Sequence, residues 1–451
     1  MSDNEFRLDW KRLLSDKRQK PNDPADKDGE KLTFKSQNAR TPFERDYDRI
    51  VFSTPFRRLA KKTQVHPFAE FDQIHNRLTH TLEVASVGRS LGAAAHRIIF
   101  ERGDFPETRM REDVICVVQS ACLAHDIGNP PFGHAGEYAI REWAKAHSTE
   151  VFDREVSESL DGPACDWRYF EGNAQAFRMM ARADDRDTHY FLLTYASLGA
   201  MIKYPWLSTD NERVKGSGKL NVFSSEEDVF LDVVDTLGLR RPDKLVVRHP
   251  LSYLSEAADD ICYRICDFED AVYMRILPEE DVKRLFIKLI GKDTHRPLSA
   301  MRAQAIGSLI EATIDVFEQH YESIMTGNRD LSRDLKSDFS EQQQEDLSEM
   351  RENYKTIFNH RPKIAVEIGA YGVLGKILGT YTRIVKALAK CKDYKRLSFI
   401  QQRCLELAWG EIYVTMHQTR DYPWWLSRVL DFVSGMTDNY ATRIAGEIEG
   451  A

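Results

Sequence analysis

Apolar residues recur at helical spacing along most of this chain, and this periodicity limits the folds that it can adopt. Residues three or four apart share one face of an α-helix, so each apolar stripe predicts a helix with one buried face. A clear stripe comprises Val84, Val87, Leu91, Ala95 and Ile98. Alternating strand patterns are scarce, and the one candidate is a short hairpin over 208–225 that turns near 215–219, where Gly-Ser-Gly equally favours a loop. We therefore expect an all-α fold with at most one short hairpin.

Two parts of the chain differ in composition. Residues 1–45 are rich in charged residues, Asn, Asp and Pro, which predicts an irregular N-terminal segment. From residue 46 onward, helical runs follow one another to the C-terminus. With 451 residues and 42% apolar content, the chain can bury a large core. We expect residues 46–451 to form one main domain with a C-terminal helical extension.

Charge and hydropathy exclude several classes of protein. The 71 acidic and 63 basic residues give a net charge of -8, which is untypical of a nucleic-acid coat protein or a polybasic membrane binder. The longest apolar stretches, such as 114–124, fall well short of the roughly 18 residues of a membrane span. Residues 1–20 are charged and lack the apolar region of a secretory signal. We therefore expect a cytoplasmic protein without membrane contact.

The seven cysteines predict reduced thiols rather than disulfides or a zinc site. Four of them lie within apolar helical patterns: Cys116, Cys122, Cys262 and Cys266. Cys262 and Cys266 are four residues apart, but no second Cys pair or nearby His in the sequence completes a set of zinc ligands. We expect these cysteines to be core residues.

The strongest chemical signal is His125-Asp126, which ends the apolar run 114–124 and so lies at the rim of a core. A carboxylate in an apolar setting needs a partner, because an unpaired buried charge is costly. A divalent cation is one such partner, and imidazole beside carboxylate suits borderline or hard metals. The alternative is a helix-capping Asp with a hydrogen-bonded His, which is the commoner explanation of an isolated pair.

Two further segments carry candidate ligands. His80 continues the apolar stripe upstream. A single histidine on such a stripe is more often a core residue whose ring nitrogens are hydrogen-bonded. Downstream, Asp259, Tyr263 and Asp267 are four residues apart and lie along one side of a helix. A solvated acidic face is the alternative there, but apolar residues leave little of this helix polar.

The order His80, His125-Asp126, Asp259 resembles the signature of the HD-domain metal phosphohydrolases. Segments spread between residues 40 and 440 also resemble the deoxyguanosine triphosphate triphosphohydrolase family: 57–65, 170–175, 198–206 and 435–438. The resemblance implies that 46–451 is an HD-type phosphohydrolase domain. It also implies hydrolysis of a deoxynucleoside triphosphate, with dGTP as the expected substrate, into a deoxynucleoside and tripolyphosphate.

The resemblance implies that His80, His125, Asp126 and Asp259 bind one divalent metal ion. Two imidazoles and two carboxylates leave positions open for water and phosphate oxygens on an octahedral ion, which suits Mg²⁺ or Mn²⁺. Such an ion would neutralise charge on the α-phosphoryl oxygens and position or acidify the attacking water. Structural zinc fits less well, because its sites usually contain Cys and are closed.

The resemblance also assigns His134 and Glu137 to catalysis. They are three residues apart in a segment expected to be helical, so they share one face. A histidine oriented by a carboxylate exchanges protons near neutral pH, either to activate water or to protonate the departing 5′-oxygen, and the sequence leaves both roles open. The alternative is an ordinary surface ion pair.

Five residues are expected to bind the substrate. Arg77 is the main phosphate-binding candidate, because a guanidinium can grip phosphate oxygens with two donors. Lys203 is a weaker candidate and equally consistent with a surface cation. The resemblance implies that Gln64, Tyr263 and Asp267 recognise the sugar, with the Tyr263 ring against C2′ to exclude a ribose hydroxyl.

Several points stay open at the level of sequence. Some relatives carry His where this chain has Asn129 and Lys where it has Asp260, which leaves the details of phosphate binding open. The alternatives are an HD phosphohydrolase acting on another nucleotide, or a nucleotide-sensing or single-stranded-DNA-binding protein with a vestigial metal site. The intact ligand set argues against the latter.

Two kinds of partner are expected besides the substrate. The family resemblance implies a homo-oligomer, such as a hexamer. Single-stranded DNA is a candidate regulator through basic residues near the N-terminus, although a solvated tail is the preferred explanation of these residues: Lys11, Arg12, Lys17, Arg18 and Lys20.

Overall fold

The computed structural model describes residues 6–19, 40–65, 72–106, 109–152, 162–182, 191–210 and 218–450. Within these residues the fold is all-α, as the apolar periodicity predicts, with no sheet and four isolated β-bridges. One bridge joins Leu207 to Val222 in parallel orientation, so the described flanks of the expected hairpin over 208–225 form no antiparallel ladder. Most of its expected turn, 215–217, lies outside the described residues.

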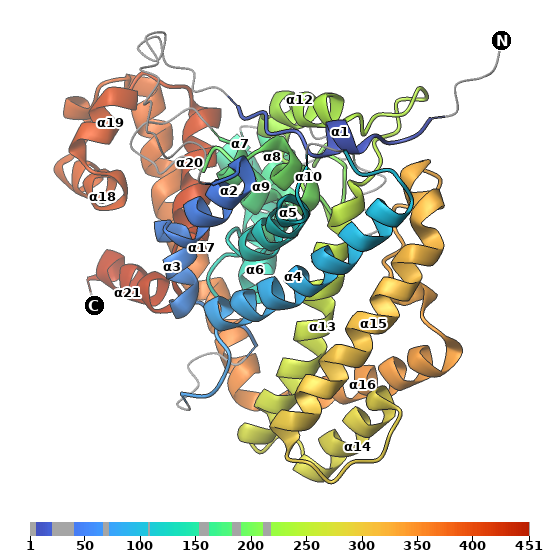
Figure 1. Ribbon diagram of the computed structural model, residues 1–451. Coiled ribbons are helices and arrows are strands. Elements are labelled where there is room, and N and C mark those ends of the chain that lie inside the picture. Colours follow the sequence, from blue (N-terminus) through green and yellow to red (C-terminus); the bar gives the residue numbers. More distant parts are fainter. Residues whose placement is uncertain are drawn as a thin grey trace.

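Long helices form the centre of the molecule, where α13 and α15 run side by side and α4 passes in front of α5 (Figure 1). The helices of this part are α1 (Trp10–Leu13), α2 (Pro42–Val51), α3 (Thr54–Arg58), α4 (Arg77–Glu101), α5 (Arg111–Ala124), α9 (Gly172–Ala181), α10 (Tyr195–Met201), α12 (Glu227–Leu237), α13 (Pro250–Tyr273), α14 (Glu279–Ile290), α15 (Leu298–Met325) and α16 (Glu341–Phe358). Their apolar faces meet in one large core that includes Leu91, Val118, Ile261 and Phe317.

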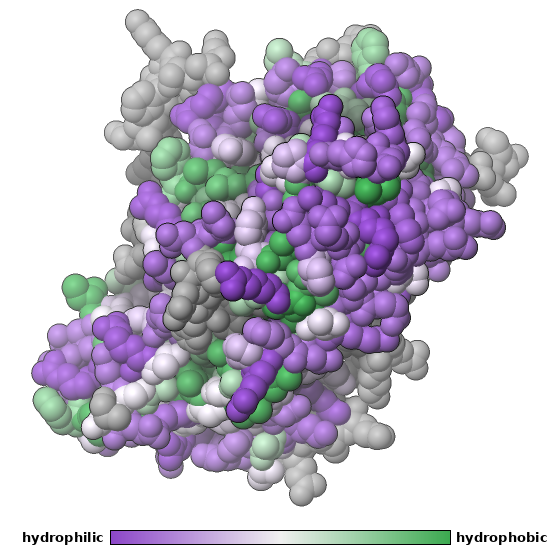
Figure 2. Space-filling view, turned by 90° about the horizontal axis from the view of Figure 1, so that it is seen from below, coloured by the Kyte–Doolittle hydropathy of each residue, from purple (hydrophilic) through white to green (hydrophobic). Residues whose placement is uncertain are grey.

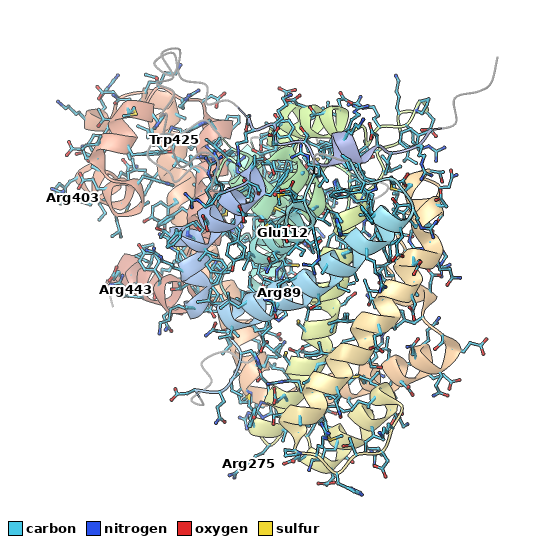
Figure 3. The ribbon with its side chains drawn as sticks, viewed as in Figure 1. Arg89, Glu112, Arg275, Arg403, Trp425 and Arg443 are labelled. Carbon is cyan, nitrogen blue, oxygen red and sulfur yellow. The ribbon has the colours of Figure 1, made fainter. Side chains whose placement is uncertain are left out.

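The C-terminal helices form a second apolar cluster together with α6. This cluster contains Ile140 of α6, and Figure 3 places its fully buried Trp425 among the C-terminal helices, with Arg403 and Arg443 at their outer edge. The helices of this part are α6 (His134–Ala146), α7 (Ser148–Phe152), α8 (Pro163–Arg168), α17 (Arg361–Cys391), α18 (Phe399–Trp409), α19 (Glu411–His417), α20 (Tyr422–Ser434) and α21 (Asp438–Glu449). Short 3₁₀ helices are η3 (Leu59–Lys61), η4 (Ser224–Glu226), η5 (Lys336–Asp338) and η6 (Tyr394–Arg396).

The N-terminal segment contributes to the core. Trp10 and Leu13 of α1 are buried in the main apolar core, and Nε1 of Trp10 donates to the hydroxyl of Tyr321 at 2.9 Å. The helix α2 runs through residue 45, where the sequence predicts that the main domain begins. That boundary stays a prediction, and the described part of the segment is more ordered than its charge-rich composition indicates.

Figure 2 shows one face of the molecule, which is mostly polar. Hydrophilic residues cover most of the face seen in Figure 2, with hydrophobic residues gathered toward its middle. Among the described helices, none combines the length and the apolar character needed to cross a membrane.

Candidate active site

Three helices bring predicted metal ligands together. His80 lies in the first turn of α4, His125 directly follows α5, and Asp259 lies near the middle of α13. The start of α4 is fixed by Asn76, whose side chain accepts two backbone N–H groups of the first turn. The start of α13 is fixed in the same way by the side chain of His249, with Pro250 as the first helical residue. Local sequence therefore sets where the ligands on α4 and α13 lie along their helices.

A glycine lets α4 and α5 approach closely. A Cβ atom on Gly88 would lie 2.6 Å from Sγ of Cys122 and 3.3 Å from a methyl group of Val118. A larger residue would have to displace these buried side chains, which costs stability in a packed core. With the helices this close, the ring centroids of His80 and His125 lie 5.6 Å apart.

The donor atoms of three predicted ligands, His80, His125 and Asp259, lie within 4.8 Å of one another. Nε2 of His80 is 3.1 Å from Oδ1 of Asp259, and Nε2 of His125 is 3.5 Å from the same oxygen. The fourth predicted ligand is adjacent, because Oδ1 of Asp126 is 3.6 Å from Nε2 of His125. Asp126 therefore lies next to this group of three.

The hydrogen bonds of His125 define its tautomer. Nδ1 of His125 is 2.5 Å from the carbonyl oxygen of Cys122, and a carbonyl only accepts, so Nδ1 carries the proton. In the neutral ring Nε2 then offers a lone pair. This Nε2 is buried without a hydrogen-bond partner in the described structure, and so is Oδ2 of Asp126. A buried acceptor left unsatisfied costs about 1–3 kcal/mol, and a divalent cation would satisfy both atoms. The residues present therefore fit a metal ion.

The two carboxylates are held in their charged form. Burial raises the pKa of Asp259, but Lys203 and the two imidazoles outweigh burial and hold this pKa well below its usual value. Burial also raises the pKa of Asp126, and Arg77 followed by the two imidazoles brings it below its usual value. Both side chains are thus anionic near neutral pH, as ligands of a hard cation must be.

A cavity of about 480 Å³ opens beside these ligands. Its wall contains nine predicted site residues: Gln64, Arg77, His125, Asp126, His134, Glu137, Lys203, Asp259 and Tyr263. His80 lies beneath the wall, with 1% of its surface exposed, and reaches the site through Asp259. Asp267 does not belong to the wall and is buried two helical turns further along α13.

His134 and Glu137 share the first turn of α6, with His134 facing the cavity. Burial lowers the pKa of His134, Glu137 raises it, and Lys219 and Arg77 lower it, with a net decrease. The imidazole is therefore neutral near pH 7 and can accept a proton. Oε1 of the buried Glu137 accepts the N–H of Gly172 at 2.7 Å. Glu137 thus acts on His134 by its charge, while its position is set by the start of α9.

Arg77 and Lys203 each bind the carboxylate of one predicted metal ligand. Nη1 of Arg77 donates to Oδ1 of Asp126 at 2.7 Å, and Nζ of Lys203 donates to Oδ2 of Asp259 at 3.1 Å. Both cations are buried in the cavity wall, so Lys203 is not the surface cation that the sequence left as an alternative. Gly133 makes room for the guanidinium, since a Cβ there would lie 2.8 Å from Nη2 of Arg77.

Comparison with known proteins identifies the family of this chain. The HD domain family model matches residues 77–163, which include two of the predicted metal-binding segments and both predicted catalytic residues. A deoxyguanosinetriphosphate triphosphohydrolase-like protein of Pseudomonas aeruginosa (strain LESB58) is 37% identical over 98% of this chain and 99% of its own length. The chain belongs to the deoxyguanosinetriphosphate triphosphohydrolase family. A deoxyguanosinetriphosphate triphosphohydrolase-like protein of Synechocystis is 34% identical over 98% of this chain and 99% of its own length. The deoxyguanosinetriphosphate triphosphohydrolase of Yersinia pestis is 28% identical over 88% of this chain and 92% of its own length.

In this member of the triphosphohydrolase family, the structure shows the contacts of Asn129 and Asp260, the two positions that the sequence leaves open. Nδ2 of Asn129 donates to Oδ1 of Asp126 at 2.5 Å, so Asn129 orients a predicted metal ligand. Asp260 also borders the cavity, but Lys336 donates to it at 2.5 Å. Asn129 therefore contacts the predicted metal site, and Asp260 forms a partly buried ion pair with Lys336.

The structure adds residues to the site that the sequence analysis did not find. Lys219 lies in the cavity wall and donates to Glu171 at 2.8 Å. Phe358 joins Tyr263 in an aromatic part of the cavity wall. The ring of Tyr354, which is not part of the wall, stacks on Tyr263 with centroids 5.3 Å apart and on Phe358 with centroids 5.2 Å apart. No local motif marks Lys219 or Phe358, because each reaches the cavity from a loop or helix far away in sequence from the predicted site residues.

Proposed function

We propose that this chain is a metal-dependent triphosphohydrolase that cuts deoxynucleoside triphosphates, with dGTP as the main substrate, at the α-phosphorus. The products are then a deoxynucleoside and tripolyphosphate. The observation that carries the proposal is the pair of buried acceptors without partners, Nε2 of His125 and Oδ2 of Asp126, at the edge of a cavity of about 480 Å³. A cavity of this size suits a nucleotide, since small-molecule sites span about 300–1,000 Å³. The names of the relatives supply the choice of substrate.

A divalent ion, Mg²⁺ or Mn²⁺, would be held by His80, His125, Asp126 and Asp259, and when bound it supplies positive charge for the α-phosphoryl oxygens. The chain's own cations assist at the same place. Arg77 lines the cavity while its Nη1 holds Asp126, so its guanidinium is placed to bind phosphate oxygens.

His134 exchanges the proton of the reaction. Its lowered pKa favours the role of acceptor from the attacking water, because the neutral imidazole keeps a lone pair at physiological pH. Glu137 stabilises the imidazolium that then forms, since its charge raises the pKa of His134. The proton can later pass to the departing 5′-oxygen of the nucleoside.

The aromatic wall selects the sugar. The ring of Tyr263 is held by its stack with Tyr354, so a ribose 2′-hydroxyl pressed against it has little room. Gln64 offers a buried Oε1 without a hydrogen-bond partner, which suits a sugar hydroxyl. Asp267 remains a proposed sugar contact. Because it is buried outside the cavity wall, its side chain would have to move to reach the sugar.

Product analysis tests the proposed activity. The purified protein is incubated with each of the four deoxynucleoside triphosphates and with GTP, in Mg²⁺ or Mn²⁺, and the products are separated by ion-exchange chromatography. Tripolyphosphate with unphosphorylated deoxynucleoside supports the proposal. Release of orthophosphate or pyrophosphate instead would point to the alternative, an HD phosphohydrolase with another reaction.

The proposed partners have unequal support. Lys17 pairs with Asp232 and Arg18 with Asp46, while Lys20 lies outside the described residues. These pairs occupy cations that single-stranded DNA would need, so we retain DNA only as a candidate regulator. Several apolar side chains on α18 and α19 are exposed and suit a contact between copies of this chain in a homo-oligomer such as a hexamer: Phe399, Ile400, Ile412 and Met416.

A further inference from the structure

A second group of metal-binding side chains lies beside the candidate active site and shares none of its residues. Nε2 of His75, a carboxylate oxygen of Glu83 and Sγ of Cys266 all lie within 4.8 Å of one another. His75 comes just before α4, Glu83 lies in α4, and Cys266 lies in α13. The sequence has no His near the Cys262-Cys266 pair, and the fold brings His75 and Glu83 to Cys266 from a distant part of the chain, since Glu83 and Cys266 are 183 residues apart.

The spacing of these donor atoms matches a tetrahedral ion. Oε2 of Glu83 is 3.2 Å from Nε2 of His75 and 3.2 Å from Sγ of Cys266. Zinc binds nitrogen and oxygen at about 2.0 Å and sulfur at about 2.3 Å, which places neighbouring tetrahedral ligands about 3.3–3.5 Å apart. Both distances from Glu83 are thus close to those of neighbouring ligands on one ion, and the third pair, His75 and Cys266, lies within 4.8 Å.

The surroundings of His75 are those of a metal-binding imidazole. Nδ1 of His75 is 2.7 Å from Oδ1 of Asp270, and the backbone N–H of His75 donates to Oδ2 of the same carboxylate at 3.1 Å. A carboxylate on the far ring nitrogen fixes the ring and points the other nitrogen at the ligand site, as around many metal-bound histidines. The fourth position of a tetrahedral ion is left to water or another ligand.

We propose that His75, Glu83 and Cys266 form a second metal site, separate from the HD ligand set, which binds Zn²⁺ or a similar ion that accepts thiolate and imidazole ligands. Binding exchanges protons for the ion. The Nε2 proton shared between His75 and Glu83 and the thiol proton of Cys266 pass to solvent, so two protons leave as one divalent cation enters and the net charge of the group is unchanged. Without metal both protons are firmly held, because Asp270 and Glu83 raise the pKa of His75 against the effect of burial, to about 10, and burial raises the pKa of Cys266.

The ion would join the two helices that carry the HD ligands. Glu83 lies one turn after His80 on α4, and Cys266 lies two turns after Asp259 on α13. An ion bound to Glu83 and Cys266 therefore holds His80 and Asp259 in register, which gives it a structural and positioning role rather than a catalytic one.

Cobalt titration tests the site directly, because Co²⁺ bound to thiolate has a near-ultraviolet charge-transfer band that a site of His and Asp lacks. The experiment uses full-length protein stripped with chelator, and the variant His125→Ala, which impairs the HD ligand set and leaves the second group intact. We expect the band to saturate at one ion per chain in both proteins, and to disappear in Cys266→Ser, with at least a tenfold loss of affinity in Glu83→Gln and His75→Gln. Excess Zn²⁺ should abolish the band and raise the unfolding temperature of the unmodified protein.

A matched control is Cys262→Ser, since Cys262 is buried on the same helix one turn before Cys266 and is not part of the group. It should keep the band. The proposal is overturned if Co²⁺ binds the unmodified protein without a thiolate band, or if the band survives Cys266→Ser in a protein with native circular dichroism. Either result leaves the HD site and its activity untouched, because the two sites share no ligand.

Discussion

Lys203 and Asp259 form an ion pair in the cavity wall, with Nζ of Lys203 3.1 Å from Oδ2 of Asp259 and the other carboxylate oxygen facing His80 and His125. One carboxylate thus joins a fixed cation to the predicted metal site. Burial lowers the pKa of Lys203, but Asp259 reverses this and raises it above the usual value, so the ammonium stays charged. This arrangement keeps Asp259 ionised in a place where burial alone would favour the neutral acid.

The first prediction concerns this ion pair. Because Lys203 lowers the pKa of Asp259, Lys203→Met should raise that pKa and move the acid limb of metal binding to higher pH. Isothermal titration with Mn²⁺ across a pH series measures the midpoint. Lys219→Met is the control, since Lys219 also lies in the cavity wall but pairs with Glu171, and its midpoint should stay in place. Equal shifts of the midpoint in both variants would mean that the overall charge of the cavity, and not the contact with Lys203, sets the pKa of Asp259.

The second prediction separates neighbouring carboxylates. Asp259→Asn should reduce Mn²⁺ affinity by more than the 10–100-fold typical of residues that only support a ligand, and should abolish most turnover. Asp260→Asn breaks only the pair with Lys336 and should retain metal and activity within a few-fold. Metal content by elemental analysis, measured on both variants, decides the assignment. Loss of metal in Asp260→Asn alone would show that the wrong neighbour was chosen.

The helices of the site could be predicted from sequence, while its contacts could not. The apolar stripes place His80 near the start of a helix and His125 at the end of another, as found. The contact between His80 and Asp259, however, spans 179 residues, and the sequence supports it only through the family resemblance.

Asp267 shows that residues on the same side of a helix need not line the same cavity. It was grouped with Asp259 and Tyr263 because the three are spaced by four residues. Eight residues of helix cover about 12 Å, and successive steps of four drift around the axis, so Asp267 lies beyond the cavity wall. Lys219 could not be predicted from the sequence. It lies in an irregular segment without helical periodicity, and only tertiary packing brings it to Glu171.

The third prediction concerns the sugar. Tyr263→Ala should narrow the preference for dGTP over GTP, because the ring that crowds C2′ is gone, whereas Tyr263→Phe keeps the ring and its stack on Tyr354 and should keep the preference. Ratios of kcat/KM for the two nucleotides provide the measurement. Equal turnover of dGTP and GTP by the unmodified protein would remove the basis of the assignment.

The fourth prediction concerns acid stability and the start of α13. His249 is fully buried: Nδ1 accepts the N–H of Leu251 and Nε2 donates to the carbonyl of Leu13. Burial lowers its pKa from 6.5 to about 4. The unfolded chain therefore binds this proton below pH 6.5 while the folded chain does not, so stability falls as pH drops from 6.5 towards 4, by about 3 kcal/mol at pH 4. Urea unfolding across this range should give a shallower pH dependence for His249→Asn, which keeps a capping side chain but does not titrate. An unchanged slope would assign the acid sensitivity to other groups.

The last prediction separates proton transfer from metal binding at the start of α6. His134 faces the cavity outside the proposed ligand set, so His134→Ala should keep its metal and its fold but lower kcat by about 10²–10⁴-fold. Glu137→Gln keeps an oxygen that can accept the N–H of Gly172, and it removes only the charge that raises the pKa of His134. Its kcat should fall less, and the acid limb of its kcat/KM profile should move to lower pH, because the imidazole then loses its proton at lower pH. If Glu137 acts through His134, the double variant should be little slower than His134→Ala, since residues that act as a unit are not additive. Loss of metal in His134→Ala, or additive losses in the double variant, would instead assign the two residues to separate tasks.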